Sequence, residues 1–304
     1  MKSKARANWR GCGTSLVTPF DERGRIDFDA ILKLVEWQIE QGIDFLVPCG
    51  ATGESATISG DERKAVTAAV VRAARGRVPV VAGAGGNHTA KAVFWARDAE
   101  QAGADGILSV SPDTRPSVDG LVRHFSAIAD ATDLPILVSN VPFRTGTDLP
   151  VDSVLRLSEI PNVVGLKEAS LDFTKIARLA ASLPEGFLLF AGNDTTALSV
   201  LALGAQGLIA DASNEIPAEM AAMVRAALTG DWETARKLHK KNLALMEMNG
   251  WEPGPGPVKC ALALMKRCGE TARLPAVPVG DETRRRIETV LAGYKLLPRK
   301  GARR

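Results

Sequence analysis

A lysine at the end of an apolar run is the residue of this chain best suited to chemistry. The run at residues 162–168 reads NVVGLKE, and Lys167 stands near its carboxyl end. A buried lysine loses hydration, so the pKa of its amine falls and the neutral amine becomes a nucleophile for carbonyl carbons. Strand alternation would place Val163, Gly165 and Lys167 on one face, and we expect the missing side chain of Gly165 to leave room beside the amine.

Two further segments carry groups suited to binding carboxylates. Residues 50–55 read GATGES, in which glycines and small residues let backbone N–H groups face a ligand and Thr52 adds a hydroxyl. Residues 140–146 read NVPFRTG, and the planar guanidinium of Arg144 could bind a second carboxylate. Taken alone, the first segment is also typical of a plain strand-to-helix turn, and Arg144 of an ordinary surface residue.

Short apolar runs alternate with amphipathic segments over most of the chain. The runs are rich in Val, Ile and Leu, which is typical of parallel strands buried on both faces. Eight strands are predicted: Gly13–Val17, Phe45–Pro48, Val78–Ala82, Gly106–Val110, Pro135–Ser139, Val163–Lys167, Leu188–Ala191 and Gly207–Ala210. Helices are predicted between them: Asp27–Gln41, Gly60–Arg75, Thr89–Ala102, Val118–Ala131, Val151–Ser158, Asp172–Leu183 and Thr195–Leu203. This pattern predicts an α/β fold, a TIM (β/α)8 barrel in preference to a doubly wound open sheet.

The pattern becomes purely helical after Ser213. Four helices are predicted there: Pro217–Leu228, Trp232–Met248, Pro257–Cys268 and Asp281–Ala292. We therefore expect residues 1–225 to form the barrel with the catalytic site, and residues 226–304 to form a helical extension packed on it. Active sites of TIM barrels lie at the carboxyl ends of the strands, so Lys167 and the two carboxylate-binding segments are predicted to converge.

Composition argues against several classes of protein. The 304 residues are 45% hydrophobic and carry a formal net charge of only +3, and basic residues gather at the two ends. This indicates solvated tails and no nucleic-acid binding. Four cysteines are widely spaced and three histidines stand singly, so we predict neither disulfides nor a metal site. Without an apolar targeting segment or membrane span, we expect a cytoplasmic protein with no membrane partner.

Together these segments resemble the dihydrodipicolinate synthase and N-acetylneuraminate lyase superfamily of Schiff-base aldolases over nearly the whole chain. The matching motifs occur in order as TPF, GATGES, NVPFRTG, GLKEAS, AGND, EPGPGPVK and RLP. The arginine, the RTG turn and the PVK segment look most like the dihydrodipicolinate synthase branch. The resemblance implies a pyruvate-dependent lyase without a metal or organic cofactor, since the iminium is the electron sink. It also implies a homo-oligomer, a tetramer or dimer.

The resemblance assigns roles to particular residues. Lys167 would form an iminium with pyruvate, and loss of a C3 proton would give an enamine that attacks an aldehyde. The loop at residues 50–52 would hold the pyruvate carboxylate, and Arg144 the carboxylate of the aldehyde. The implied catalytic residues are Lys167, Thr52 and Ser139. The implied substrate-binding residues are Gly50, Ala51, Thr52, Arg144, Gly192 and Ile209.

The chain lacks the tyrosines with which this family moves protons. The position before Asn140 is Ser139, and the loop at residues 111–116 reads SPDTRP where the family has a Pro-Tyr-Tyr stretch. Ala51 replaces the first of two usual threonines, and the single tyrosine is Tyr294. A serine hydroxyl is a far poorer acid than a phenol, and positioned acid–base groups typically contribute roughly 10² to 10⁴ in rate.

Three functions therefore remain open. The first is a pyruvate Schiff-base lyase for another aldehyde or hydroxy-oxoacid, with Thr52, Ser139 or an ordered water replacing the tyrosine. The second is a dihydrodipicolinate synthase in the strict sense, condensing pyruvate with aspartate semialdehyde on the way to lysine, with Asp113 or Thr114 as an unexpected proton donor. The third is a non-catalytic oxoacid-binding protein that keeps the lysine without turnover.

Four other residues are expected to have structural roles or an uncertain one. We interpret Asp194 as a helix cap, Glu54 as structural and Lys259 as an exposed residue after a proline. Trp251 lies in a turn and could cover a pocket.

Overall fold

The strands form a closed barrel. The computed structural model describes residues 7 and 9–298; the basic ends at residues 1–6 and 299–304 lie outside the described residues. Within the described part the eight parallel strands are β1 Gly11–Ser15, β2 Phe45–Val47, β3 Val81–Gly83, β4 Gly106–Val110, β5 Ile136–Asn140, β6 Val163–Glu168, β7 Leu188–Ala191 and β8 Gly207–Ala210. Their order is β2-β1-β8-β7-β6-β5-β4-β3, and a parallel bridge between Leu46 and Val80 joins its two ends. The predicted TIM barrel is confirmed.

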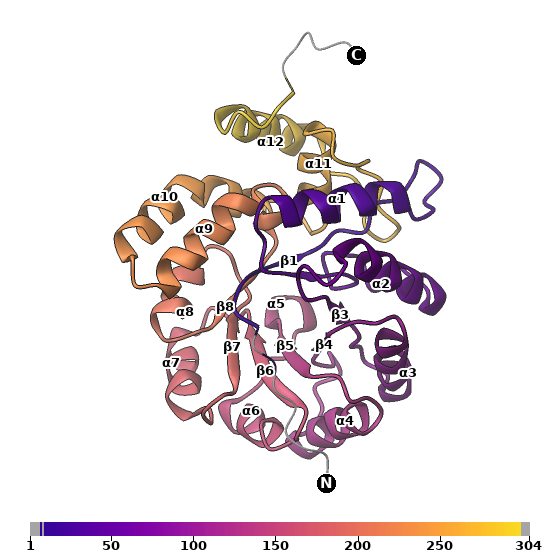
Figure 1. The fold of residues 1–304 in the computed structure, drawn as a ribbon, viewed down its shortest axis with the longest axis vertical. Helices are drawn as coiled ribbons and strands as arrows, with labels where there is room; N and C mark the ends of the chain where they lie inside the picture. The colour runs from indigo at the N-terminus through magenta and orange to yellow at the C-terminus, as the bar shows by residue number, and fades with distance from the viewer. Residues whose placement is uncertain (1–6, 8, 299–304) are drawn as a thin grey trace.

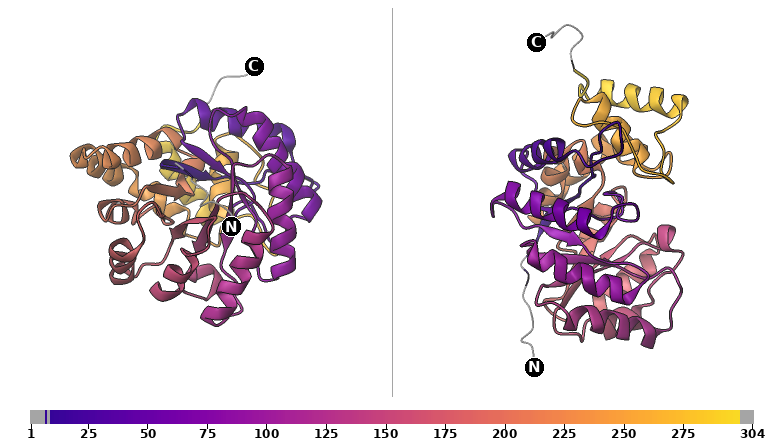
Figure 2. Two further views of the ribbon diagram at one scale, coloured as in Figure 1. Left: turned by 60° about the horizontal axis from the view of Figure 1, so that its bottom comes forward. Right: turned by 90° about the vertical axis from the view of Figure 1, so that its right-hand side faces the viewer.

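Helices surround the strands (Figure 2, left). The barrel helices are α1 Phe28–Glu40, α2 Gly60–Ala74, α3 Thr89–Gln101, α4 Val118–Asp130, α6 Val151–Leu157, α7 Phe173–Ser182, α8 Ala197–Ala202 and α9 Pro217–Leu228. The later helices are α10 Trp232–Met248, α11 Gly256–Leu264 and α12 Asp281–Gly293. In Figure 1, α10 lies against α9, and α11 and α12 lie together beyond α1. The predicted helical extension at the carboxyl end is confirmed.

Local sequence explains where several helices begin. Ser59 and Glu62 form a capping box at the start of α2, in which the Ser59 hydroxyl accepts from the Glu62 N–H and the Glu62 carboxylate accepts from the Ser59 N–H. Asp27 accepts a hydrogen bond from the Ala30 N–H at the start of α1 in the same manner. The sequence pattern did not predict the one-turn helix α5 (Pro142–Thr145), which begins at a proline.

Large apolar side chains fill the barrel interior. They form a cluster separate from the larger core between strands and helices: Trp9, Phe45, Val47, Val81, Leu108, Leu137, Val164, Leu188, Phe190 and Ile209. The rings of Phe45 and Phe190 meet edge to face with centroids 5.5 Å apart. Because this cluster closes the interior below, polar side chains are left to the layer at the carboxyl ends of the strands.

A β-bulge changes which residues of β6 face inward. Ile136 pairs with Val163 and Leu137 pairs with Gly165, so Val164 is an extra residue in β6. Val164 packs in the interior cluster, whereas Val163 packs in the outer core. The prediction that Val163 shares the face of the later inward residues of β6 was therefore wrong, because the bulge shifts the alternation by one residue.

None of the helices in the described part of the chain combines the length and apolar character that a membrane span needs. Among the same residues, no group of three or more His, Cys, Asp and Glu side chains is arranged to hold a metal ion.

Candidate active site

Lys167 lies at the carboxyl end of β6 with only 9% of its surface exposed. Burial lowers the pKa of its amine below the usual 10.5; the charge of Asp211 opposes this and the charge of Arg144 adds to it. Within residues 9–298 the amine makes no hydrogen bond or ion pair. An amine that is desolvated and uncommitted is suited to nucleophilic attack on a carbonyl carbon.

Lys167 lines a cavity of about 120 Å³. Its other walls come from the ends of β1, β3, β4, β5 and β7, the loop after β2, helix α5 and the residue after β8. The cavity brings together all but one of the residues implied to be catalytic or substrate-binding: Gly50, Ala51, Thr52, Ser139, Arg144, Lys167 and Gly192. Ser139 is buried and is paired in register with Lys167 across β5 and β6. Residues far apart in the sequence thus converge because parallel strands end at one rim of the barrel.

Ile209 is the implied residue that the structure does not bring to the cavity. Its side chain is 1% exposed and packs in the interior cluster. Alternation along β8 places Asp211, two residues later, one layer above it, and Asp211 lines the cavity. Asp211 can therefore make the contact that was expected from Ile209. The sequence did not lead us to predict Asp211, although this residue directly follows the apolar run at residues 207–210.

Gly192, and not Gly165, gives the lysine its room. A Cβ at Gly192 would lie 3.0 Å from both Cγ and Cε of Lys167. A Cβ at Gly165 would instead lie 2.5 Å from the Leu188 carbonyl oxygen and 2.7 Å from the side chain of Leu137. The prediction about Gly165 was wrong, because the space beside it is filled by interior packing below the amine.

Thr52 belongs to a chain of three polar side chains. The Ser15 hydroxyl donates to the Thr52 hydroxyl at 3.0 Å, and Thr52 donates to the Asp211 carboxylate at 2.6 Å. The three residues come from β1, the loop after β2 and the residue after β8. All three line the cavity that contains Lys167. This series of hydrogen bonds therefore connects two walls of the cavity and ends at the Asp211 carboxylate.

A second carboxylate, that of Asp194, binds the backbone of Asp211. Asp194 is buried and accepts from the backbone N–H groups of Asp211 (3.2 Å) and Ala212 (2.8 Å). Burial and the charge of Asp211 raise the pKa of Asp194 to about 7. The expectation that Asp194 caps a helix was wrong: helix α8 starts after Thr196, which makes no side-chain cap, and Asp194 instead holds the turn after β8.

A wider cavity of about 720 Å³ adjoins the first. Phe143, Arg144, Gly192 and Asp211 line both cavities. Trp251 lines the wider one, as expected for a residue that could cover a pocket. The smaller cavity has room for a molecule of the size of pyruvate, and Arg144 stands where a larger partner would enter.

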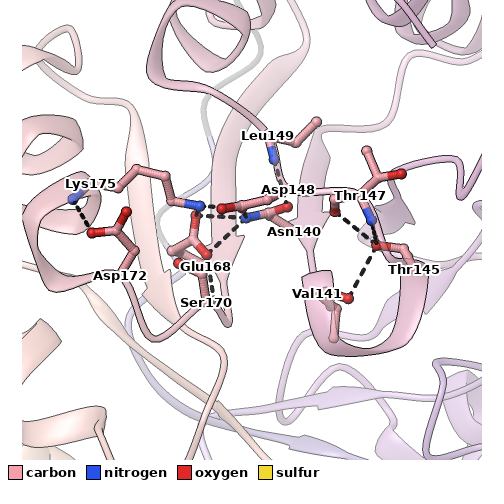
Figure 3. A network of polar contacts seen from close by, with 10 residues as sticks. All are labelled: Asn140, Val141, Thr145, Thr147, Asp148, Leu149, Glu168, Ser170, Asp172 and Lys175. Carbon is pink, nitrogen blue, oxygen red and sulfur yellow. Dashed lines mark hydrogen bonds and ion pairs between the residues drawn. The ribbon is translucent and has the colours of Figure 1, made fainter. Parts of the chain in front are cut away.

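The outer faces of β5 and β6 are fixed by a polar network (Figure 3). The Asn140 amide donates to both oxygens of Glu168, at 2.9 and 3.0 Å. The Lys175 amine lies 3.1 Å from Glu168 and also pairs with Asp148. Because Asn140 and Glu168 directly follow Ser139 and Lys167, this network holds both strands at the height of the cavity.

Asp113 and Thr114, the alternative proton donors considered from the sequence, do not line either cavity of this chain. Both are exposed, and the Asp113 N–H donates to the side chain of Asn87.

Lys259 is buried, contrary to expectation. It is 0% exposed, its amine pairs with Glu54, and it donates to the Thr271 carbonyl at 2.7 Å. The prediction failed because the extension folds over the loop at residues 50–55, and α11 is buried on nearly every side. Glu54 has the structural role expected of it, and its left-handed backbone (φ 55°) is a conformation that this pairing helps to hold.

Comparison with known proteins places the chain among enzymes of one kind. It matches the dihydrodipicolinate synthetase family over residues 8–293. It is 50% identical over 285 residues to a 4-hydroxy-tetrahydrodipicolinate synthase of Koribacter versatilis, covering 93% of this chain and 95% of that protein. A 4-hydroxy-tetrahydrodipicolinate synthase of Acidobacterium capsulatum is 46% identical over 290 residues, covering 94% and 96%.

A solved structure has the same architecture. The dihydrodipicolinate synthase of Aquifex aeolicus superposes with a TM-score of 0.93 at 36% identity, covering 96% of this chain and 100% of that one. Family match, identity over nearly the full length and shared fold agree: this chain belongs to the dihydrodipicolinate synthetase family and is a lyase.

Proposed function

We propose that this protein is a 4-hydroxy-tetrahydrodipicolinate synthase, which condenses pyruvate with aspartate semialdehyde through a Schiff base on Lys167. The observation that carries the proposal is the buried amine of Lys167, unpaired among the described residues, in a small cavity at the barrel rim. The names of relatives that share 46–50% identity support the choice of the aldehyde. The three functions left open by the sequence are thereby ordered, with the strict synthase first.

The reaction begins at the amine. Because burial lowers its pKa, a larger fraction of Lys167 is neutral near pH 7 than of an exposed lysine. The amine adds to the pyruvate ketone, and loss of water gives an iminium. The iminium withdraws electrons from C3, which loses a proton and becomes an enamine carbon. That carbon attacks the aldehyde, and water then releases the product from the lysine.

Two groups are proposed to hold the carboxylates. The loop at Gly50 and Ala51 presents backbone to the smaller cavity, where the pyruvate carboxylate would lie. The guanidinium of Arg144 borders both cavities and would bind the carboxylate of the aldehyde. Arg144 also lowers the pKa of Lys167 through its charge, so the same group favours the neutral amine.

Borohydride trapping tests the covalent step. The protein is incubated with pyruvate and sodium borohydride, and intact and peptide masses are measured, with Lys167→Ala as the control. We expect a reduced pyruvyl adduct on Lys167 and none in the variant. Absence of the adduct in the natural protein would overturn the proposal and leave a family scaffold with another use.

Turnover then tests the aldehyde. We expect steady consumption of aspartate semialdehyde with pyruvate. An adduct with turnover only of another aldehyde would favour the first function left open by the sequence. An adduct without turnover across an aldehyde panel would favour an oxoacid-binding protein. Assembly into a homo-oligomer belongs to the same proposal and is measured by light scattering.

A further inference from the structure

We infer that Asp211 is the catalytic acid–base residue of this site, taking the place of the tyrosines that the chain lacks. The inference rests on the Schiff-base chemistry of the proposed function and concerns how its protons move. Ser139 alone leaves the cavity without a strong acid or base at the position of the missing tyrosine. The carboxyl group of Asp211 supplies such an acid–base group on the opposite wall of the cavity.

The position of Asp211 fits this role. It is the residue directly after β8, and β8 ends at the same rim of the barrel as β6, which carries Lys167. Asp211 lines both the smaller cavity, where the iminium would form, and the wider cavity, where the aldehyde would enter. Of the carboxylates on the described residues, it is the one that borders the smaller cavity. A proton held there can reach either reactant.

The hydrogen bonds of Asp211 form a path for protons. Thr52 has a single hydroxyl proton and donates it to Asp211 at 2.6 Å, while Ser15 donates to Thr52. With Asp211 ionised, the hydroxyl of Thr52 is therefore not available to donate to pyruvate. If Asp211 takes up a proton, it can donate to Thr52, and Thr52 can then turn its own proton toward the ligand. Proton uptake by Asp211 thus frees a donor for an anionic substrate.

Several charged groups face Asp211. Lys167 and Arg144 line the same cavity, and Asp194 lies behind the turn, accepting from the Asp211 N–H. The charge of Asp211 raises the pKa of Lys167, Asp194 and Glu215. Asp211 thus interacts with two other acids, Asp194 and Glu215, and stands beside two basic side chains, Lys167 and Arg144.

Asp211 would move one proton in each of three steps. Protonated Asp211 gives its proton to the departing hydroxyl of the carbinolamine, which leaves as water and gives the iminium. The resulting carboxylate then removes a proton from C3, and the electron pair of that C–H bond becomes the enamine double bond while the iminium nitrogen becomes neutral. Asp211 is thereby protonated again and can protonate the oxygen of the aldehyde when the new C–C bond forms. Atoms and charges balance without a further reactant.

Exchange of the C3 protons of pyruvate tests Asp211 without any aldehyde. The protein is incubated with pyruvate in D₂O, and loss of the methyl signal is followed by proton NMR; adduct formation at equilibrium is measured by borohydride trapping on the same samples. In Asp211→Asn the amide oxygen can still accept from Thr52, so the fold and the cavity are kept. We expect the variant to form the adduct but to exchange about 100-fold more slowly.

Two matched variants complete the experiment. Asp130→Asn makes the same change on the exposed end of α4 and should exchange as the natural protein does. Asp113→Asn removes the rival carboxylate of the exposed loop. The inference would be overturned if Asp211→Asn exchanged the C3 protons at the natural rate, or if only Asp113→Asn lost this exchange. It would also be overturned if the natural protein formed the adduct without exchanging these protons. No adduct in the natural protein is a different result, because it removes the proposed function itself and the role of Asp211 with it.

Discussion

Two lysines, Lys167 and Lys259, are buried in this protein under opposite conditions. The amine of Lys259 pairs with Glu54, donates to a carbonyl oxygen and lies 4.2 Å from the centre of the Phe20 ring. The amine of Lys167 has no such partner within the described residues. Burial lowers the pKa of both, and a nearby carboxylate opposes the effect at each: Glu54 through direct pairing with Lys259, and Asp211 at Lys167 through its charge alone. Burial alone therefore does not mark a nucleophile; burial without a directly bonded partner does.

The partners also differ in what they support. Glu54 forms an ion pair with the Lys259 amine and accepts from the N–H of Arg273, so it ties the loop at residues 50–55 to the carboxyl-terminal part of the chain. The carboxylates near Lys167 stand beside the cavity and are joined to Thr52 and to backbone N–H groups. One lysine is a structural cation, and the other is free to react.

The largest expected effect is a separation of activity from stability. Lys167→Met should abolish the pyruvate adduct and lower turnover by on the order of 10⁴-fold or more, because the covalent route is lost. Its free energy of unfolding should not fall, since an uncompensated buried amine is removed. Lys259→Met should instead still form the pyruvate adduct, and its free energy of unfolding should fall. Trapping by mass spectrometry and urea denaturation measure the two quantities, and a Lys167→Met protein that unfolds much more easily would break the comparison.

Removing one partner of the buried pair should be costly. Glu54→Gln leaves the Lys259 amine buried without its counter-charge, and we expect a loss of about 3 to 5 kcal/mol in the free energy of unfolding. Chemical denaturation measures this loss. The double variant Glu54→Gln, Lys259→Met should recover part of it, because no buried charge then remains unpaired. A double variant no more stable than Glu54→Gln would argue against the pair as the cause.

Asp194 should make stability depend on pH. Its pKa is about 7 in the folded protein and near 3.8 when unfolded, so between these values the folded protein holds a proton that the unfolded chain releases. The free energy of unfolding should therefore fall as pH rises from about 4 to 7, by up to about 1.4 kcal/mol per pH unit. Asp194→Asn should flatten this slope. An unchanged slope in thermal or urea melts would assign the dependence to other groups.

The smallest effect is expected at the glycine beside the reactive lysine. In Gly192→Ala the new Cβ would lie 2.8 Å from the Cβ of Ala169 and 3.0 Å from the Lys167 side chain. Because the lysine stem must shift, we expect the rate of adduct formation to fall about tenfold, since small misplacements near the chemistry lower rates substantially. Timed borohydride quenching measures this rate. Recovery of this rate in the double variant Gly192→Ala, Ala169→Gly would identify steric crowding as the cause.

The barrel and much of the cavity could be predicted because they follow from periodic patterns and the rule that strand ends converge. Lys167 stands at the end of an apolar run, and Thr52 and Arg144 lie a few residues after the runs that precede them, so their meeting point follows from the fold. The bulge in β6 could not be predicted, since one extra residue in a run of apolar residues leaves no mark in the sequence. It changed the neighbours of Gly165 and Val163.

The remaining misses concern contacts between distant segments. Asp211 follows an apolar run as clearly as Thr52 follows its strand, so its position could have been found by the same rule. The burial of Lys259 had a weaker signal, its apolar neighbours on both sides in PVKCAL. Its partner, Glu54, lies far away in the sequence, and pairing over such a separation depends on how the extension packs, which no local pattern records.

The tie between Glu54 and the carboxyl-terminal part of the chain has a consequence for synthesis. The Arg273 N–H that binds Glu54 is separated from it by 219 residues, and Lys259 also comes late in the chain. During translation the barrel strands and Lys167 are made long before these partners, so the loop at residues 50–55 lacks these contacts until residues 259–273 have been made. A ribosome-bound barrel would therefore carry its nucleophile without a finished carboxylate site, and activity would begin only after residues 259–273 have folded against the loop.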